Sequence, residues 1–355
     1  MATSMTPAAA PAAGSGKTVP PRLELFQLLT GHYVSRAIYV AARLGVADLL
    51  ADGPRTAEEL AEKAGAHGPS LRRLLRLLAS RGVFAELPDG RFALTPLSEC
   101  LRSDTPSSSR PVALLFAGPI MRAWDELLYS VQTGQIAFDR VFSMPAFQYM
   151  GEHPEDAATF NAAMTAGSSV TAAGVPAAYD FSSHRTLVDV GGGHGVLLTA
   201  ILKANPRLRG VLFELPFVAE GARKAIAAAG LSDRCEVVSG DFFKGIPEGA
   251  DAYILKSVIH DWDDARSVAI LKECRRAMAP DGKLLLVELV LPDRIDQTPR
   301  SQMGAGSDVN MLVNVGGRER TDADFRALFE ASGFRLVAIR PVENTMMSVL
   351  EGVRA

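Results

Sequence analysis

The sequence predicts an α/β protein with two parts, a mainly helical N-terminal half and a doubly wound, mostly parallel sheet in the C-terminal half. From about Leu23 to Tyr179 the apolar residues follow helical spacing. From Thr186 onward short apolar runs alternate with helical stretches, which is typical of parallel strands joined by crossover helices. A glycine-rich turn follows the first apolar run, and the polar segment 180–185 separates the two halves.

Composition excludes several classes of protein. A chain of 355 residues is too long for one ordinary compact domain and suits two. Its formal net charge of −3 provides no general attraction to nucleic acid or anionic lipid. No apolar run approaches the roughly 18 to 20 residues of a membrane helix, so we expect neither a nucleic-acid nor a membrane partner.

The cysteines and histidines argue against disulfides and bound metal. The three cysteines lie far apart, and none belongs to a Cys-x-x-Cys pair, which favours a reducing cytoplasm. The six histidines are scattered, and no two have the helical spacing of metal ligands. We therefore expect no metal site built by the protein.

The chain divides into four predicted segments. Residues 1–21 are rich in Ala, Pro, Ser and Thr and lack the apolar core of a signal peptide, which indicates a disordered leader. A winged-helix-like domain is expected over residues 22–105 and a set of linking helices over residues 106–182. The sheet domain is expected over residues 183–355.

The first domain is expected to begin with two apolar helices, Leu23–Leu29 and Tyr33–Leu50. Because apolar residues cover much of their circumference, they must be buried inside the domain or against a partner chain. The sequence therefore suggests a homodimer.

A helix–helix–hairpin pattern follows in the first domain. Thr56-Ala57-Glu58-Glu59 is a capping box that begins one helix, and Ser70–Ser80 is a second helix with leucines on one side. The runs Phe84–Leu87 and Arg91–Leu94 flank a Pro-Asp-Gly turn, which predicts a hairpin. This winged-helix pattern often binds DNA, but its arginines have acidic neighbours, whereas a phosphate-binding surface should be distinctly basic.

The linking segment is expected to contain helices at Pro111–Gln132, Ala146–Glu152 and Pro154–Tyr179. Several aromatic side chains fall within them. Such a series forms either ordinary core or part of a pocket, and the position directly before the sheet domain makes pocket lining plausible.

The second half is expected to form the sheet. Strands are predicted at five apolar runs: Thr186–Val190, Gly210–Glu214, Cys235–Ser239, Ala252–Lys256 and Lys283–Leu289. Helices fall between them, and Thr321–Ser332 is a further helix. The runs Arg335–Arg340 and Met346–Gly352 predict a final antiparallel pair.

A glycine-rich turn between the first strand and the helix Val196–Ala204 is the strongest functional signal. Ligands bind outside the carboxyl ends of strands in open α/β sheets, and glycines let them approach the main chain. The dinucleotide fingerprint requires glycine five positions after Gly191, where Val196 stands instead. The charge of Asp189 would also oppose a pyrophosphate. It suits a cationic ligand such as S-adenosylmethionine, so we place Asp189, Gly191 and Gly193 at that cofactor.

Acidic residues also follow the next two strands. Glu214 is positioned to accept hydrogen bonds from both ribose hydroxyls. Asp241 is suited to accept from an adenine amino group while Phe242 covers the ring. Three successive strands that each end in an acidic residue at one sheet edge form a specific pattern.

The fourth predicted strand leads into LKSVIHDWDD, residues 255–264. Together with DVGGGHG, FELP, GDFF and VGGRERT in the same order, this motif resembles the plant-caffeate-type and bacterial small-molecule O-methyltransferases. The resemblance covers about Leu23 to the C-terminus. It implies a Rossmann-like methyltransferase sheet, a winged-helix dimerisation domain, a homodimer, S-adenosylmethionine as cofactor, and a small hydroxylated aromatic substrate from secondary metabolism.

The resemblance also implies roles for individual residues. His260 matches the family's general base, and Glu288 and Glu319 match the acidic residues that flank and orient it. Positions that contact the cofactor are matched by Gly191, Glu214, Asp241, Phe242, Lys256 and Trp262. The acceptor pocket is matched by Asn310 and Met311, and more loosely by Phe160 and Met164.

Elementary chemistry agrees with a histidine base. A phenol has a pKa of about 10, so little phenolate exists at neutral pH. Imidazole, with an ordinary pKa of about 6.5, is a suitable acceptor for the phenol proton. A carboxylate on its other nitrogen would fix the tautomer, and base catalysis of this kind typically contributes about 10² to 10⁴ in rate.

Three other functions remain open at this point. Some relatives with this fold use S-adenosylmethionine for decarboxylation or hydroxylation without methyl transfer, but they tend to lack the histidine base. N-methylation is also possible, because an aromatic nitrogen needs less help from a base. A ligand-sensing DNA-binding regulator would use the winged helix, but would leave His260, Glu288 and Glu319 without a purpose.

Overall fold

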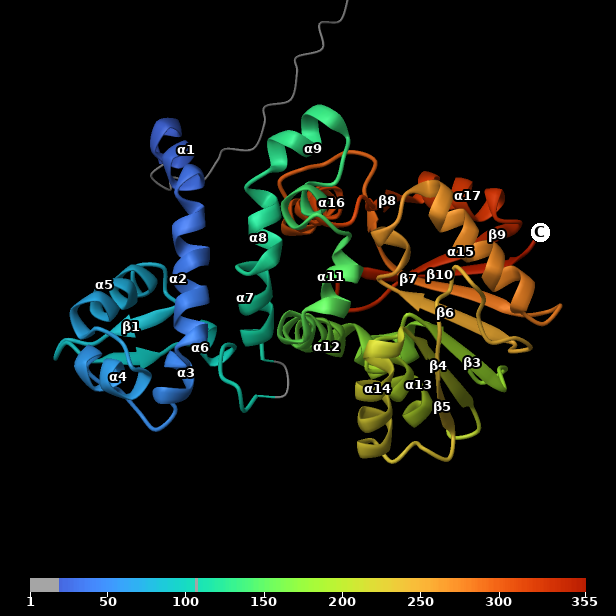
Figure 1. Ribbon diagram of the computed structural model, residues 1–355, viewed down its shortest axis with the longest axis horizontal. Helices are drawn as coiled ribbons and strands as arrows, with labels where there is room; N and C mark the ends of the chain where they lie inside the picture. The colour runs from blue at the N-terminus through green and yellow to red at the C-terminus, as the bar shows by residue number, and fades with distance from the viewer. Residues whose placement is uncertain (1–18, 106–107) are drawn as a thin grey trace, which may run out of the picture.

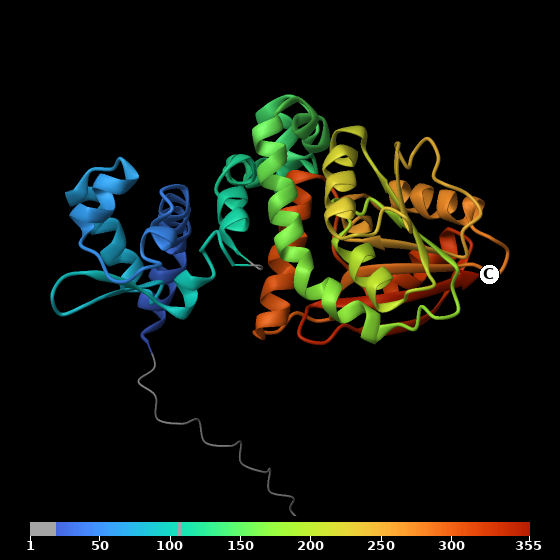
Figure 2. The same cartoon turned by 90° about the horizontal axis from the view of Figure 1, so that it is seen from below.

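The computed structural model describes residues 19–105 and 108–355 (Figure 1). Most of the predicted leader therefore lies outside the described residues. The N-terminal elements stand at one end of the molecule and the sheet at the other, with a group of linking helices between them (Figures 1 and 2). Within the described part of the chain, no helix combines the length and apolar character needed to span a bilayer.

The predicted doubly wound sheet is confirmed. Its strands are β3 (Thr186–Val190), β4 (Arg209–Glu214), β5 (Cys235–Ser239), β6 (Ala252–Lys256), β7 (Lys283–Leu291), β9 (Phe334–Pro341) and β10 (Met347–Arg354). They run in the order β5-β4-β3-β6-β7-β10-β9. The first five are parallel. Strand β10 is antiparallel to both neighbours, and its pairing with β9 is the final antiparallel pair that the sequence predicted. A short strand that was not predicted, β8 (Arg320–Thr321), pairs with the end of β7.

Helices cover both faces of the sheet because both faces are apolar. Val188 and Val190 pack on one face with helices α15 (Asp264–Ala277) and α17 (Asp322–Ala331). Leu187 packs on the opposite face with α12 (Pro154–Ala178), α13 (Val196–Ala204) and α14 (Pro216–Ala228). Strands that are buried on both faces appear in sequence as nearly continuous apolar runs, which explains why their bounds were predicted closely.

The helix–helix–hairpin arrangement of the first domain is also confirmed. Its elements are α1 (Pro21–Leu29), α2 (Gly31–Arg43), α3 (Val46–Leu49), α4 (Ala57–Ala64), α5 (Gly68–Ala79), β1 (Phe84–Glu86), β2 (Phe92–Leu94) and α6 (Pro96–Glu99). The capping box at Thr56 is present. The single helix predicted over Tyr33–Leu50 is wrong, because Gly45 adopts a φ of 65° and separates α2 from α3.

The linking helices are shorter and more numerous than predicted. They are α7 (Arg110–Phe116), α8 (Pro119–Trp124), α9 (Leu127–Thr133), α10 (Ala137–Phe142), α11 (Ala146–Glu152) and α12 (Pro154–Ala178). The one helix predicted over Pro111–Gln132 is three helices, and its first break falls at Gly118, directly before Pro119. The residue before a proline disfavours helical backbone. Helix α16 (Pro299–Asn314) lies beside this group and completes it (Figure 2).

Candidate functional site

Four parallel strands deliver the predicted cofactor residues to one edge of the sheet. In the order β5, β4, β3 and β6 they end at Ser239, Glu214, Val190 and Lys256, and each pair of neighbours is in register. The glycine loop after β3 has positive φ angles at Gly191, Gly193 and Gly195, of 71°, 60° and 76°. These angles favour glycine over residues that carry a Cβ.

The glycine loop also packs too closely for side chains. A Cβ at Gly191 would lie 2.9 Å from Cγ2 of Val258, and a Cβ at Gly192 would overlap the carboxylate of Asp189. The loop therefore exposes main chain rather than side chains at the strand end.

The structure places Asp189 beneath this loop. Its side chain is fully buried, and neither carboxylate oxygen has a hydrogen-bond partner among the described residues. Burial raises the pKa of Asp189 to about 7, although the nearby charge of Lys256 lowers it. Lys256 itself donates a hydrogen bond to Ser257 Oγ at 3.0 Å, and burial lowers its pKa. A buried negative charge without a partner is costly, so a cation held near the loop would stabilise it.

The other two acidic strand ends contact backbone amides. Glu214 Oε1 accepts a hydrogen bond from the amide of Gly193 at 2.8 Å, and Oε2 accepts one from Leu215 at 2.6 Å. Asp241 Oδ1 accepts from the amide of Phe243 at 2.9 Å, and its carboxylate pairs with Lys244 at 3.3 Å. Both carboxylates keep acceptor capacity, because each ionised carboxylate has about four lone-pair sites.

Aromatic rings gather at the same edge. The ring centroids of Phe242 and Phe243 lie 5.9 and 4.9 Å from that of Trp262, both edge to face. Phe147 from α11 stacks on Trp262 at 5.8 Å. The indole Nε1 of Trp262 is buried without a hydrogen-bond partner among the described residues. The sequence placed Phe242 and Trp262 at the cofactor, and the structure brings them together.

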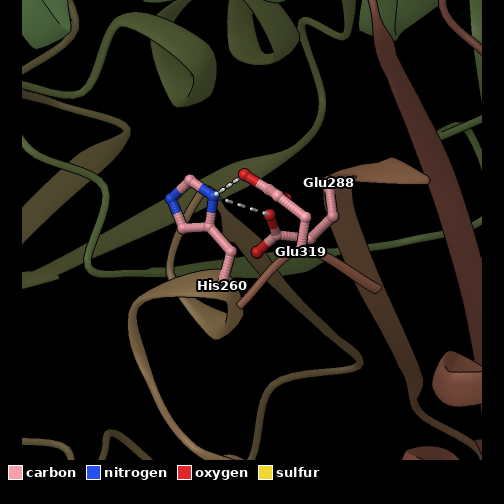
Figure 3. Close-up of side chains that lie close together, drawn as sticks. All are labelled: His260, Glu288 and Glu319. Atoms are coloured by element: carbon pink, nitrogen blue, oxygen red, sulfur yellow. Dashed lines mark hydrogen bonds and ion pairs between the residues drawn. The ribbon is translucent and has the colours of Figure 1, made fainter. Parts of the chain in front are cut away.

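His260 lies on a short 3-10 turn, η1 (Ile259–Asp261), directly after β6. Its Nδ1 makes a hydrogen bond of 2.9 Å with Oε1 of Glu319 and lies 3.9 Å from Oε2 of Glu288 (Figure 3). Both glutamates approach the same ring nitrogen, and Nε2 points away from them (Figure 3). The His260 side chain is 17 % exposed, whereas both glutamates are buried. The structure thus brings together three residues that are far apart in the sequence.

Each glutamate is itself held in place. Oε1 of Glu288 accepts hydrogen bonds from the amides of Val258 and Ile259, so this residue also supports the turn that carries His260. Oε1 of Glu319 accepts one from the hydroxyl of Ser307 at 2.6 Å. The Glu319 amide donates to Asp308 at 2.9 Å. Ser307 and Asp308, both on α16, were not identified from the sequence.

A third carboxylate completes this cluster. Oδ1 of Asp261 lies 3.5 Å from Nε2 of His260, the nitrogen that the glutamates leave open. Its position directly after the histidine in the motif was the only sequence signal for it. Burial raises the pKa of Asp261 to about 6 and that of Glu288 to about 7.

The three carboxylates control the charge of His260. Burial lowers the pKa of His260. The charges of Glu288 and Asp261 and the hydrogen bond to Glu319 raise it by more than burial lowers it, so that the pKa is about 10. Among the described residues, His260, Glu288 and Glu319 also form one group whose potential metal-ligand atoms lie within 4.8 Å of one another. The expectation that the protein builds no metal site stays a prediction.

The four predicted acceptor residues lie on two helices of the linking group. Asn310 on α16 accepts a hydrogen bond from the indole of Trp124 at 2.9 Å. Phe160 on α12 packs against the same two apolar clusters as Trp124. Met311 is buried, and Met164 is 41 % exposed. Trp124 thus links Asn310 to the clusters that Phe160 also contacts, whereas Met311 and Met164 differ in exposure.

A cavity of about 790 Å³ lies between α11, α12, α14, the glycine loop and the segment that leads into α7. Its lining includes Met150, Asn161, Thr165, His194 and Phe217. Because His194 belongs to the glycine loop, this cavity borders the edge of the sheet described above. The sequence did not identify it, since its lining comes from five separate segments.

Family models match most of the chain. An O-methyltransferase domain matches residues 124–335, and an O-methyltransferase dimerisation domain matches residues 26–104. The chain is 47% identical over 325 residues to a phenazine O-methyltransferase of Lysobacter antibioticus. This alignment covers 92% of this chain and 94% of that protein.

Two other proteins extend the comparison. An 8-amino-8-demethylriboflavin N,N-dimethyltransferase of Streptomyces davaonensis is 37% identical, with 89% and 91% of the two chains covered. The crystal structure of an O-methyltransferase from neocarzinostatin biosynthesis, in complex with S-adenosylmethionine and 2-hydroxy-5-methyl naphthoic acid, superposes with a TM-score of 0.82. The two sequences are 34% identical, and the superposition covers 96% of this chain and 100% of the neocarzinostatin enzyme's chain.

Proposed function

We propose a specific reaction for this chain, which belongs to the family of S-adenosylmethionine-dependent O-methyltransferases. The enzyme methylates a small natural-product substrate, and we propose that the methyl group goes to a hydroxyl of an aromatic ring. The hydrogen bond between His260 and Glu319 carries this proposal. A ring hydroxyl must lose its proton when its oxygen is methylated, and an oriented imidazole is suited to accept it.

The edge of the sheet suits the cofactor. S-adenosylmethionine supplies the methyl group from a positively charged sulfonium. We propose that the glycine loop, with the unpartnered charge of Asp189 beneath it, favours this cation. Glu214 would bind the ribose hydroxyls and Asp241 the adenine amino group. Phe242 and Trp262 would cover the adenine, and Lys256 completes the set of proposed contacts.

We propose that His260 accepts the hydroxyl proton at Nε2. The hydrogen bond from Nδ1 to Glu319 favours the tautomer with a proton on Nδ1, so Nε2 is the acceptor. The imidazolium that forms is then stabilised by the charges of Glu319 and Glu288. Because these carboxylates raise the pKa of His260 to about 10, the free enzyme at neutral pH holds an imidazolium. Only the small neutral fraction of His260 can accept the proton, and that fraction grows as pH rises toward the pKa.

The acceptor ring is proposed to bind between α12 and α16. Asn310 has a fixed orientation because its amide oxygen accepts from Trp124, and Phe160 packs against the same apolar cluster as Trp124. Met311 and Met164 are the other residues we assign to this pocket. Methionine side chains adapt to irregular shapes, which suits a pocket for a polycyclic ligand.

The test is a panel of phenols incubated with isotopically labelled S-adenosylmethionine and analysed by mass spectrometry. We expect at least one labelled O-methyl product from the wild type. His260→Ala should lower turnover about tenfold or more, because base catalysis is lost, and leave cofactor affinity nearly unchanged. His184→Ala is the matched control, since His184 is half-buried and bonds to Tyr179 away from the site. Full activity of His260→Ala would remove this residue from the mechanism.

N-methylation is the second candidate, and the similarity to the Streptomyces davaonensis N,N-dimethyltransferase favours it. A neutral amine nitrogen is a stronger nucleophile than a neutral hydroxyl oxygen, so its methylation needs less base catalysis. Aromatic amines in the same panel separate the two functions. Labelled amine products from both the wild type and His260→Ala would support N-methylation, and labelled ethers from the wild type alone would support O-methylation.

A further inference from the structure

Arg320 is a buried arginine beside the proposed catalytic cluster. Its side chain is 1 % exposed, and it is among the largest fully buried side chains of the protein. Arginine is almost never fully buried unless its charge and its donors are satisfied. It lies on β8, directly after Glu319.

The guanidinium of Arg320 bridges the two ends of the turn that carries His260. Nη1 donates to the carbonyl of Ile259 at 2.9 Å, and Nη2 donates to the carbonyl of Trp262 at 2.9 Å. These carbonyls stand on either side of His260 and Asp261 in the chain. The turn has two backbone hydrogen bonds of its own, from the amide of Asp261 to the carbonyl of Val258 at 3.2 Å and from the amide of Trp262 to the carbonyl of Ile259 at 3.3 Å. The guanidinium of Arg320, from a different segment, adds a second connection between the two ends of the turn.

Two side chains of α15 complete the binding of Arg320. Nη2 donates to Asp264 Oδ1 at 2.8 Å and to the hydroxyl of Ser267 at 3.1 Å. The same Ser267 hydroxyl lies 3.3 Å from the carbonyls of both Ile259 and Trp262. Only a planar fork of donors reaches all of these acceptors at once, and the single ammonium of lysine does not.

The segment before Arg320 is pressed against the same turn. A Cβ at Gly317 would overlap the carbonyl of His260. Successive residues of an extended strand point to opposite sides, so Glu319 reaches the imidazole while Arg320 reaches the backbone of the same turn. One short segment therefore holds both the ring of His260 and its main chain.

We propose that Arg320 is a positioning residue for methyl transfer: it fixes the turn Ile259–Trp262 so that His260 keeps its hydrogen bond to Glu319 and presents Nε2 to the acceptor. This inference rests on the proposed role of His260. Displacement of a reacting group by about 1 Å can cost about 10²-fold in rate, so loosening this turn should affect turnover more than binding.

The test compares Arg320→Lys with the matched control Arg234→Lys. Arg234 also donates to several carbonyls, those of Leu202, Asn205, Pro206 and Leu208, at the opposite end of the sheet. We expect Arg320→Lys to lower kcat about tenfold or more. The dissociation constant for S-adenosylmethionine should rise by a smaller factor, because only Trp262, at the end of the turn, belongs to the proposed cofactor site. Arg234→Lys should lower thermal stability and leave kcat unchanged.

The pH profile of kcat/KM separates positioning from a structural role. The charged groups that face His260 are Glu288 on β7, Asp261 on its own turn, and Glu319 before β8. If Arg320→Lys weakens the bond to Glu319, the rise of kcat/KM with pH should move to lower pH. Arg234→Lys should not move it.

A milder variant keeps the test informative if Arg320→Lys does not fold. Ser267→Ala removes one partner of Arg320 with little change in volume, and should lower kcat several-fold with a smaller shift of the profile in the same direction. An unchanged kcat and profile in both Arg320→Lys and Ser267→Ala would overturn the positioning role. Full activity of His260→Ala would instead refute the proposed function.

Discussion

The charge state of His260 depends on three carboxylates that reach it from three segments of the chain. Glu288 and Glu319 face Nδ1, and Asp261 lies near Nε2. A negative environment stabilises the imidazolium that forms during proton transfer, but it also keeps the free enzyme protonated. The three carboxylates that stabilise the imidazolium product therefore also limit how much neutral imidazole is available as a base before the reaction.

This balance predicts an alkaline pH dependence. Because the pKa of His260 is raised to about 10, the neutral base becomes more abundant as pH rises toward that value. We expect kcat/KM for a phenolic acceptor to rise tenfold per pH unit through neutral pH and to level off in the alkaline range. Initial rates measured with subsaturating acceptor over this range test the expectation.

Glu288→Gln provides the control for that profile. The variant removes one negative charge near Nδ1, but its amide oxygen can still accept from the backbone of the turn. The pKa of His260 should fall, so the rise in kcat/KM should move down by about one pH unit. A profile that is flat in the wild type, or identical in Glu288→Gln, would argue against titration of His260.

Glu214 is predicted to determine cofactor affinity. Glu214→Ala removes an acceptor for the ribose hydroxyls and also the carboxylate that holds the amide of Gly193. We expect the dissociation constant for S-adenosylmethionine to rise about tenfold or more, because hydrogen bonds to charged groups contribute about 1.5–3 kcal/mol. Calorimetry measures this, with the exposed Glu236 of the neighbouring strand changed to Ala as control. Wild-type affinity in Glu214→Ala would contradict the ribose assignment.

At the scale of elements, the glycine loop has no room for a side chain at Gly192. Gly192 has no positive φ, yet a Cβ there would overlap the carboxylate of Asp189 and the side chain of Leu212. Gly192→Ala should therefore displace the loop and weaken cofactor binding about tenfold or more, by loss of well-placed hydrogen bonds.

Gly167→Ala is the matched control for the loop. Gly167 is an exposed residue of α12, and a Cβ there meets nothing within 4 Å. Alanine in a helix is favoured over glycine by about 0.5–1 kcal/mol, so this variant should be slightly more stable and bind cofactor normally. Equal affinities in the two variants, measured by calorimetry, would show that the loop adapts to a side chain.

Strands and helices differed in how well the sequence predicted them. The five parallel strands appear as short apolar runs, because both faces of the sheet are covered, and their bounds agree with the structure within two residues. Helix breaks were missed at Gly45 and Gly118, and helices α10 and α16 were not recognised. Breaks between short packed helices depend on local backbone choices that apolar spacing does not record.

At the scale of the whole molecule, helix α1 presents an apolar surface. None of its residues is buried, and Leu25, Phe26, Leu28 and Leu29 are each more than half exposed. An exposed apolar helix is unfavourable in water. The sequence left two alternatives for these helices, burial inside their own domain or against a partner chain. Because α1 is not buried among the described residues, burial against a partner chain is the alternative that fits it. We propose that residues 22–105 form the dimerising unit.

This surface predicts a homodimer in solution. Light scattering should give a mass near twice 37.8 kDa. The double variant Phe26→Asp with Leu29→Asp places charges in the apolar surface and should shift the mass toward one chain. Ile295→Asp, which changes an exposed apolar residue in the loop before α16, should leave the dimer intact. A wild-type mass near 37.8 kDa would refute the dimer.

The sequence alone determined the sheet, the glycine loop, the acidic strand ends and the histidine, because each is encoded by neighbouring residues: a strand, its turn and the side chain that follows. The resemblance placed Glu288 and Glu319 beside that histidine, but only the tertiary structure decided what holds these side chains and the turn in place. The turn is held by Arg320, which lies 61 and 58 residues from the two carbonyls that it binds, and Glu319 is held by Ser307 of α16, a helix the sequence did not reveal. Local spacing carries no information about which distant side chains will meet when the core packs.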